Sequence, residues 1–165
     1  MKTILNWKNE LFTGTCRIYS EDILIGYLID KSWSQYAEGE LNGEKYLFKT
    51  KGFFNRETQI YKVENDMPIG KITFNTWMRK AKVEYSGEVY SWSFIYVFST
   101  KWILQNDDGF LVCYNSSFSR GTIESDMQNS LLVLTGVFIR NYLSKTSVAF
   151  VTSVFLPFCI IIFIV

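Results

Sequence analysis

The chain has 165 residues, with 17 Lys and Arg side chains and 16 Asp and Glu side chains, so its formal net charge is +1. It contains no histidine, which excludes Ser-His-Asp and Cys-His catalysis, histidine metal ligands and a histidine pH switch. A single domain is typical of this length, and a hydrophobic content of 48% is enough for a core.

We expect no export signal in the amino-terminal segment. Its apolar run stops at Leu5, whereas a secretory signal needs about 7 to 15 apolar residues. The three cysteines, Cys16, Cys113 and Cys159, are odd in number and far apart. This pattern favours reduced thiols in a cytosolic environment, each packed as a small hydrophobic side chain.

Residues 15–126 are rich in Tyr, Phe, Trp, Ile and Val, which is typical of β-sheet. Turn residues separate runs of strand length. We expect about eleven strands in this region, with the sequences TCRIYS, ILIGYLID, SQYAEGEL, KYLFKTK, ETQIYKVE, PIGKITFN, KAKVEYS, EVYSWSFIYVF, KWILQ, GFLVCYN and RGTIES.

The turns support this assignment. Asn42-Gly43 is the strongest two-residue hairpin signal, because a type I′ turn needs positive φ at both positions. Further turn signals are Asn65-Asp66, Ser86-Gly87 and Asp107-Asp108-Gly109, so that the turn centres are 21 to 23 residues apart. Short strands at even spacing indicate a sandwich or a barrel.

The carboxylates near these turns also allow a functional interpretation. Asp66, Asp107 and Asp108 are potential metal ligands or an acid pair, but Asx turn chemistry explains them without a function. Glu84 and Glu88 flank one hairpin, where solvated strand faces are the expected interpretation rather than a catalytic carboxylate pair.

The pattern changes after the strands. The segment MQNSLLVLTGVFIRNYL, residues 127–143, has no charge between Leu131 and Ile139. A helix that is apolar on nearly all sides is buried in a core or in lipid. We expect a short buried helix near residues 129–143, with Asp126 or Asn129 as its cap and with Arg140 marking the end of the apolar stretch.

The last residues form a second hydrophobic segment. Residues 147–165 carry no charge, and Arg140 and Lys145 precede them. The length suits a membrane span of roughly 17 to 25 residues, and the positive-inside rule then leaves the preceding domain in the cytoplasm. The alternative is a strand in the core or a dimer interface, because Pro157 would kink a helix and the Val and Ile residues suit a strand.

Residues 36–143 resemble the tubby C-terminal-like superfamily, which includes tubby-like proteins, phospholipid scramblases and LURP-one-related proteins. The resemblance is one of order and pattern across EGELNGEKYLFKTK, ETQIYKVENDMPIGKITFN, KWILQNDDGFLVCYN and LLVLTGVFIRNYL. It implies a twelve-stranded barrel with a hydrophobic helix through its centre. The chain departs from the pattern in its small size and in the apolar segment after the helix.

Two basic segments are candidates for a binding surface. The first has Lys45, Lys49, Lys51 and Arg56 around Phe53 and Phe54, and the second has Arg79, Lys80 and Lys82 beside Trp77. Cations and aromatic rings together suit lipid headgroups, and the resemblance to tubby-like proteins implies phosphoinositide binding as one possibility. The alternative interpretation is a set of solvated strand ends that oppose edge pairing.

These observations combine into one prediction. We expect a mainly β protein with a closed or nearly closed antiparallel barrel of about 11–12 strands in residues 1–143, and an anchor in residues 146–165. The expected function is non-enzymatic binding at a membrane surface, to anionic lipid headgroups or to a protein partner. The resemblance alone adds a scramblase-like role. The alternative is a soluble cytoplasmic carrier of a small hydrophobic ligand, with a hollow barrel.

Other classes of function have no support in the sequence. Glycine-rich phosphate loops, CxxC pairs and GxSxG motifs are absent, so we expect no enzyme, no cofactor and no metal site. Residues 1–130 hold 15 basic and 16 acidic groups, which argues against a nucleic-acid partner.

Overall fold

The computed structural model describes residues 2–10, 13–30, 35–51, 57–75, 79–96, 100–125 and 129–145. Twelve antiparallel strands in these ranges form a closed barrel in which each strand pairs with its neighbours in sequence and β1 pairs with β12. The strands are β1 Thr3–Asn9, β2 Thr15–Ser20, β3 Ile23–Ile29, β4 Tyr36–Leu41, β5 Glu44–Lys51, β6 Glu57–Lys62, β7 Pro68–Phe74, β8 Lys80–Tyr85, β9 Glu88–Phe94, β10 Lys101–Gln105, β11 Leu111–Ser117 and β12 Arg120–Ser125.

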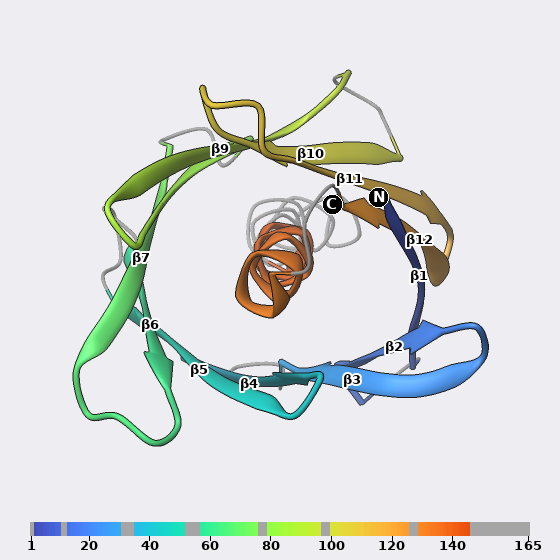
Figure 1. Ribbon diagram of the computed structural model, residues 1–165, viewed down its shortest axis with the longest axis horizontal. Helices are drawn as coiled ribbons and strands as arrows, with labels where there is room; N and C mark the ends of the chain where they lie inside the picture. The colour runs from blue at the N-terminus through green and yellow to red at the C-terminus, as the bar shows by residue number, and fades with distance from the viewer. Residues whose placement is uncertain are drawn as a thin grey trace, which may run out of the picture.

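One helix, residues 130–145, runs inside the ring of strands. Figure 1 shows it in the centre of the barrel, with the strands around it. The closed barrel and the buried apolar helix that the sequence predicted are therefore confirmed. Among the described residues, no helix has both the length and the apolar character needed to cross a membrane. The expected anchor, residues 146–165, lies outside the described residues.

Alternation of side chains builds the barrel wall. In β5, Tyr46, Phe48 and Thr50 face inward and are buried, whereas Lys45 and Lys51 are exposed. Two predicted hairpin turns have the expected backbone: Asn42 and Gly43 have φ of 52° and 81°, and Ser86 and Gly87 have φ of 54° and 81°. Positive φ at both positions matches the right-handed twist of the flanking strands.

The first strand, β1, is absent from the predicted set, which begins at residue 15. In β1, Leu5 and Trp7 are buried while Ile4, Asn6 and Lys8 point outward. The outward-facing Ile4 next to the buried Leu5 breaks the alternation of polar and apolar residues in this short segment, so the strand has only a weak signal in the sequence. β1 closes the barrel through its pairing with β12, which leaves no open sheet edge.

The helix is fixed to the wall at several points. Asn129 caps it, since its side-chain Oδ1 accepts from the Leu132 N–H at 3.1 Å, which confirms one of the two predicted caps. The Tyr114 hydroxyl bonds the carbonyls of Leu132 and Val133, each at 3.1 Å. Trp92 Nε1 donates to the Gly136 carbonyl at 3.2 Å.

Apolar packing supplies the larger stabilisation. Phe138 stacks on Phe48 with ring centres 4.5 Å apart, and the helix residues Leu131, Leu134 and Ile139 are fully buried. Each such side chain contributes about 1.5–3 kcal/mol through burial. The helix continues two residues beyond the predicted end, to residue 145, because Tyr142 and Leu143 still pack against the core.

Candidate functional site

The two ends of the barrel are different surfaces. At one end, here called the exit end, β1, β3, β5, β7, β9 and β11 end and the next strands begin. The described part of the helix reaches the same end, because Lys145 Nζ lies 2.8 Å from Asp30 Oδ1, just after β3. At the other end, the far end, the helix begins and the turns at 42–43 and 86–87 join the strands.

The two halves of the barrel, taken along its axis, have net charges of opposite sign. Among the described residues, the exit half of the strands, connections and helix holds eleven basic and four acidic side chains, a net charge of +7. The far half holds three basic and eleven acidic side chains, a net charge of −8, and Lys71 lies at the middle of β7. The near-zero net charge of the whole chain therefore hides two surfaces of opposite sign.

Of the cations predicted for headgroup binding, the structure describes six, and all but Lys45, the second residue of β5, lie in the exit half. Lys49 and Lys51 are near the end of β5, Arg79 and Lys80 are at the start of β8, and Lys82 follows on the same strand. The two segments thus come together at one end, with β6 and β7 between β5 and β8. Arg56, Phe53, Phe54 and Trp77 lie outside the described residues.

Two of these cations have partners on the barrel wall. Lys49 Nζ lies 4.4 Å from the centre of the Tyr61 ring. Lys82 Nζ pairs with Glu84 at 2.9 Å, and this hydrogen bond is the largest of the influences that lower the pKa of Glu84. Both lysines are therefore held in place by neighbouring side chains.

Two other cations are free to meet a ligand. Arg79 and Lys80 are exposed, and their backbone N–H groups donate to Asn75 Oδ1 at 2.8 and 3.0 Å. Within the part of the chain that the structure describes, neither side chain has an ion-pair partner. The backbone contacts fix the start of β8, and the two charged groups remain in solvent.

Exposed hydrophobic side chains accompany the cations, and the sequence analysis did not single them out. Tyr36, Ile95, Tyr96 and Phe118 are all exposed at the exit end, and Phe118 is 87% exposed in the turn between β11 and β12. The signal was present in the sequence: in a meander of hairpins, alternate connections meet at the same end, so alternate loops belong to one surface.

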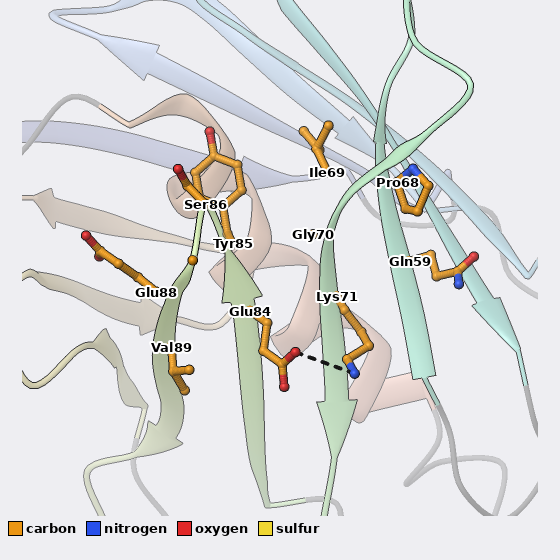
Figure 2. A pocket seen from close by; sticks show the side chains of 11 residues that line it. Gln59, Pro68, Ile69, Gly70, Lys71, Glu84, Tyr85, Ser86, Glu88 and Val89 are labelled. Carbon is orange, nitrogen blue, oxygen red and sulfur yellow. Dashed lines mark ion pairs between the residues drawn. The ribbon is translucent and has the colours of Figure 1, made fainter.

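A shallow groove of about 410 Å³ lies on the outer face of β7, β8 and β9. Figure 2 shows Lys71 and Glu84 pointing toward one another across it, 3.5 Å apart. Glu84 also pairs with Lys82, and these contacts hold its pKa below the ordinary value. A carboxylate stabilised in this way is a poor general base at neutral pH.

Local contacts account for Glu88, and the turns that contain Asp66, Asp107 and Asp108 are capped by Asn65 and Asn106, which accept from the N–H groups of Met67 and Phe110 at 3.1 and 2.7 Å. Glu88 Oε2 accepts from the Tyr90 hydroxyl at 2.5 Å and from Asn106 Nδ2 at 3.0 Å. Among the described residues, no group of three His, Cys, Asp or Glu side chains is placed to hold a metal ion.

The interior is largely filled by the helix. One hollow of about 290 Å³ lies at the far end, between the start of the helix and the wall, lined by Leu5, Ile25, Leu41 and Val133 together with polar side chains that include Asn129.

Arg140 was expected to mark the end of the apolar stretch, but it lies inside the barrel. Its guanidinium Cζ is 5.5 Å from the ring centre of Trp7 and 5.7 Å from that of Trp102. Burial lowers the pKa of Arg140. Burial also raises the pKa of the Cys16 thiol to about 12, so that thiol is neutral at physiological pH.

No protein family model, curated protein or solved structure matches this chain. The class that the structure defines is a closed antiparallel barrel of twelve strands with a buried central helix. Membership of the tubby C-terminal-like superfamily stays a prediction from the sequence.

Proposed function

We propose that this protein is a non-enzymatic binding module for the surface of a membrane that contains anionic lipids, with its exit end toward the lipid. The observation that carries the proposal is the net charge of +7 in the exit half, at the end that residue 145 of the helix reaches. In the sequence, the uncharged residues 147–165 follow directly, and we propose that they anchor the chain in the same membrane.

The distribution of charge sets the orientation of the barrel in the proposed docking. Each Lys or Arg near an anionic leaflet contributes about 1 kcal/mol of attraction. Lys51, Arg79, Lys80 and Arg120 are exposed at the exit end, and the exposed rings of Tyr96 and Phe118 suit the boundary between headgroups and acyl chains. The far half, with a net charge of −8, is repelled by the same leaflet.

The alternative, a soluble carrier, requires a hollow barrel. The central helix occupies that interior, with Leu131, Leu134 and Ile139 fully buried, and this favours a function on the outer surface. A scramblase-like role rests only on the sequence resemblance, and no contact among the described residues adds to it.

The test uses the full chain in nanodiscs of zwitterionic lipid, with and without an anionic lipid, and measures amide hydrogen exchange. We expect slower exchange at the exit end on anionic nanodiscs, around residues 79–82 and 117–120, and no change at the turns 42–43 and 86–87. The triple variant Arg79→Gln, Lys80→Gln, Lys82→Gln removes about 3 kcal/mol of attraction, and this protection should disappear.

A matched control removes the same charge from the far half, through Lys2→Gln, Lys45→Gln and Lys62→Gln. This variant should keep the protection of the exit end. Equal loss in both triple variants, or slower exchange at the far end, would show that the exit end is not the docking surface.

A further inference from the structure

The guanidinium of Arg140 is a largely buried cation without a carboxylate. Its hydrogen bond is from Nη1 to Asn141 Oδ1 at 3.2 Å, and among the described residues no acidic side chain pairs with it. By contrast, Arg17 pairs with Glu10 at 2.5 Å, and Lys145 pairs with Asp30 at 2.8 Å.

The groups around Arg140 compensate its charge only in part. The faces of Trp7 and Trp102 provide cation–π contacts, and these offset some of the cost of removing a cation from water. The thiol of Cys16, the one other group that influences the pKa of Arg140, is held neutral by burial. Among the described residues, most of the five N–H donors of the guanidinium have no acceptor.

A second buried donor beside Arg140 also lacks a partner. Trp102 is 1% exposed, and its Nε1–H has no acceptor among the described residues. The same group in Trp7 donates to the Asn115 carbonyl, and that in Trp92 donates to the Gly136 carbonyl, each at 3.2 Å. Because buried indole N–H groups are normally satisfied, the exception next to an unpaired cation indicates a place for an anion.

Arg140 and Trp102 lie close to the exit end. Trp102 is the second residue of β10, and Trp7, whose ring lies beside Arg140, is two residues from the end of β1. Lys8 and Arg120, exposed on the paired strands β1 and β12, raise the local concentration of anions. Arg140 keeps intermediate exposure, so an anion attracted to this end of the barrel meets a cation that is accessible from solvent.

We propose that Arg140 and the Trp102 indole form a binding site for a phosphate-type oxyanion that enters from the exit end. The planar guanidinium fork matches two oxygens of a phosphate group, and the indole N–H supplies a further donor. Anion binding is independent of the proposed function, whereas a lipid source for the phosphate rests on it.

The first experiment measures thermal unfolding of the full chain in a nonionic detergent, in inorganic phosphate and in chloride at equal ionic strength. Phosphate also stabilises proteins in general by exclusion from their surface, so the result is the difference between the wild type and Arg140→Met. At a phosphate concentration of ten times Kd, we expect phosphate to raise the unfolding temperature of the wild type by about 3–6 °C more than that of Arg140→Met.

The matched control is Lys45→Met, which removes an exposed cation from the far half and should respond to phosphate as the wild type does. In chloride, Arg140→Met should unfold at the same temperature as the wild type or higher, because it replaces a charge that is only partly compensated inside the barrel with an apolar side chain. Equal phosphate responses of the wild type and Arg140→Met would overturn the proposal.

If Arg140→Met does not fold, an NMR titration of the wild type tests the same site. The Trp102 indole N–H resonance should shift on titration of inorganic phosphate, and Arg140→Lys, which keeps the charge but loses the fork, should bind at least about tenfold more weakly. An indole resonance that phosphate does not move would refute the site.

The source of the phosphate is tested with the same resonance. Short-chain phosphatidic acid is compared with inorganic phosphate and with the matching diacylglycerol, which lacks the phosphate. Tighter binding of the lipid supports a headgroup as ligand, and equal binding supports a free oxyanion. A response to diacylglycerol alone would exclude anion recognition. Because no membrane is present, this result is separate from the nanodisc experiment.

Discussion

At Gly136 the central helix lies close against Tyr114 of the barrel wall. A Cβ atom at this position would lie 2.7 Å from Cε2 of Tyr114, and it would overlap the hydroxyl oxygen and Cζ of the same ring still more closely. Tyr114 cannot move aside easily, because it is 1% exposed, stacks on Trp102 with ring centres 5.3 Å apart, and bonds two helix carbonyls. Gly136→Ala therefore forces the helix or the wall to shift.

The expected loss of stability is the balance of two destabilising effects and one stabilising effect. Overpacking a core costs about 1–3 kcal/mol, and displacing a hydrogen bond of the Tyr114 hydroxyl costs about 1 kcal/mol more. Alanine gains about 1 kcal/mol over glycine in a helix interior. Gly136→Ala should thus lower the free energy of unfolding by about 1–3 kcal/mol.

Chemical denaturation of the full chain in detergent, followed by tryptophan fluorescence, measures this difference. Ser144→Ala, at an exposed position of the same helix, should change stability by less than about 0.5 kcal/mol. The background Tyr114→Leu removes the hydroxyl and shortens the side chain that collides, so that Gly136→Ala should cost less there. If Gly136→Ala raises stability by the amount expected for a free helix, the close contact is refuted.

Two further predictions concern the ends of the helix. Asn129→Ala removes the cap on the Leu132 N–H and should cost about 1 kcal/mol, measured by the same denaturation, whereas Asn129→Asp should retain most of the stability. Burial raises the pKa of Asp30 above its ordinary value of 3.8, although Lys145 opposes the shift. Its linked contribution to stability is therefore full below about pH 3.8 and is lost as pH rises through the raised pKa. The stability of the wild type relative to Asp30→Asn should fall over that range, and a rise would contradict the direction of the shift.

Local signals in the sequence predicted most of the strands, several turns and a buried helix, but they left a sandwich or a barrel open, and the barrel with a central helix was implied by the family resemblance. Asn42-Gly43 and Ser86-Gly87 specify their turns through backbone geometry, which depends on few neighbours. The absence of charge from Leu131 to Ile139 required a buried helix, and the barrel provides that environment. β1 escaped prediction because its partner, β12, is more than a hundred residues away, and a short alternation without a neighbouring turn is a weak signal.

The candidate site was less accessible to sequence reasoning. Arg79 and Lys80 were recognised as cations at a strand junction, but their common end with Lys51 depends on the up-and-down order of the strands. Arg140 was expected at a boundary because charged residues usually end a buried segment. Its place between two indole rings arises from contacts among β1, β10 and the helix, which no local pattern encodes.

The pairing of β1 with β12 has a consequence for synthesis of the protein. The first strand emerges from the ribosome early, but its partner and the helix that fills the interior are among the last barrel segments made. At about 5 to 20 residues per second, roughly 7 to 27 s separate the completion of β1 from that of the helix. During that interval the nascent sheet has a free edge and an uncovered apolar face. Such a chain is expected to depend on chaperones until its carboxyl-terminal segment is released.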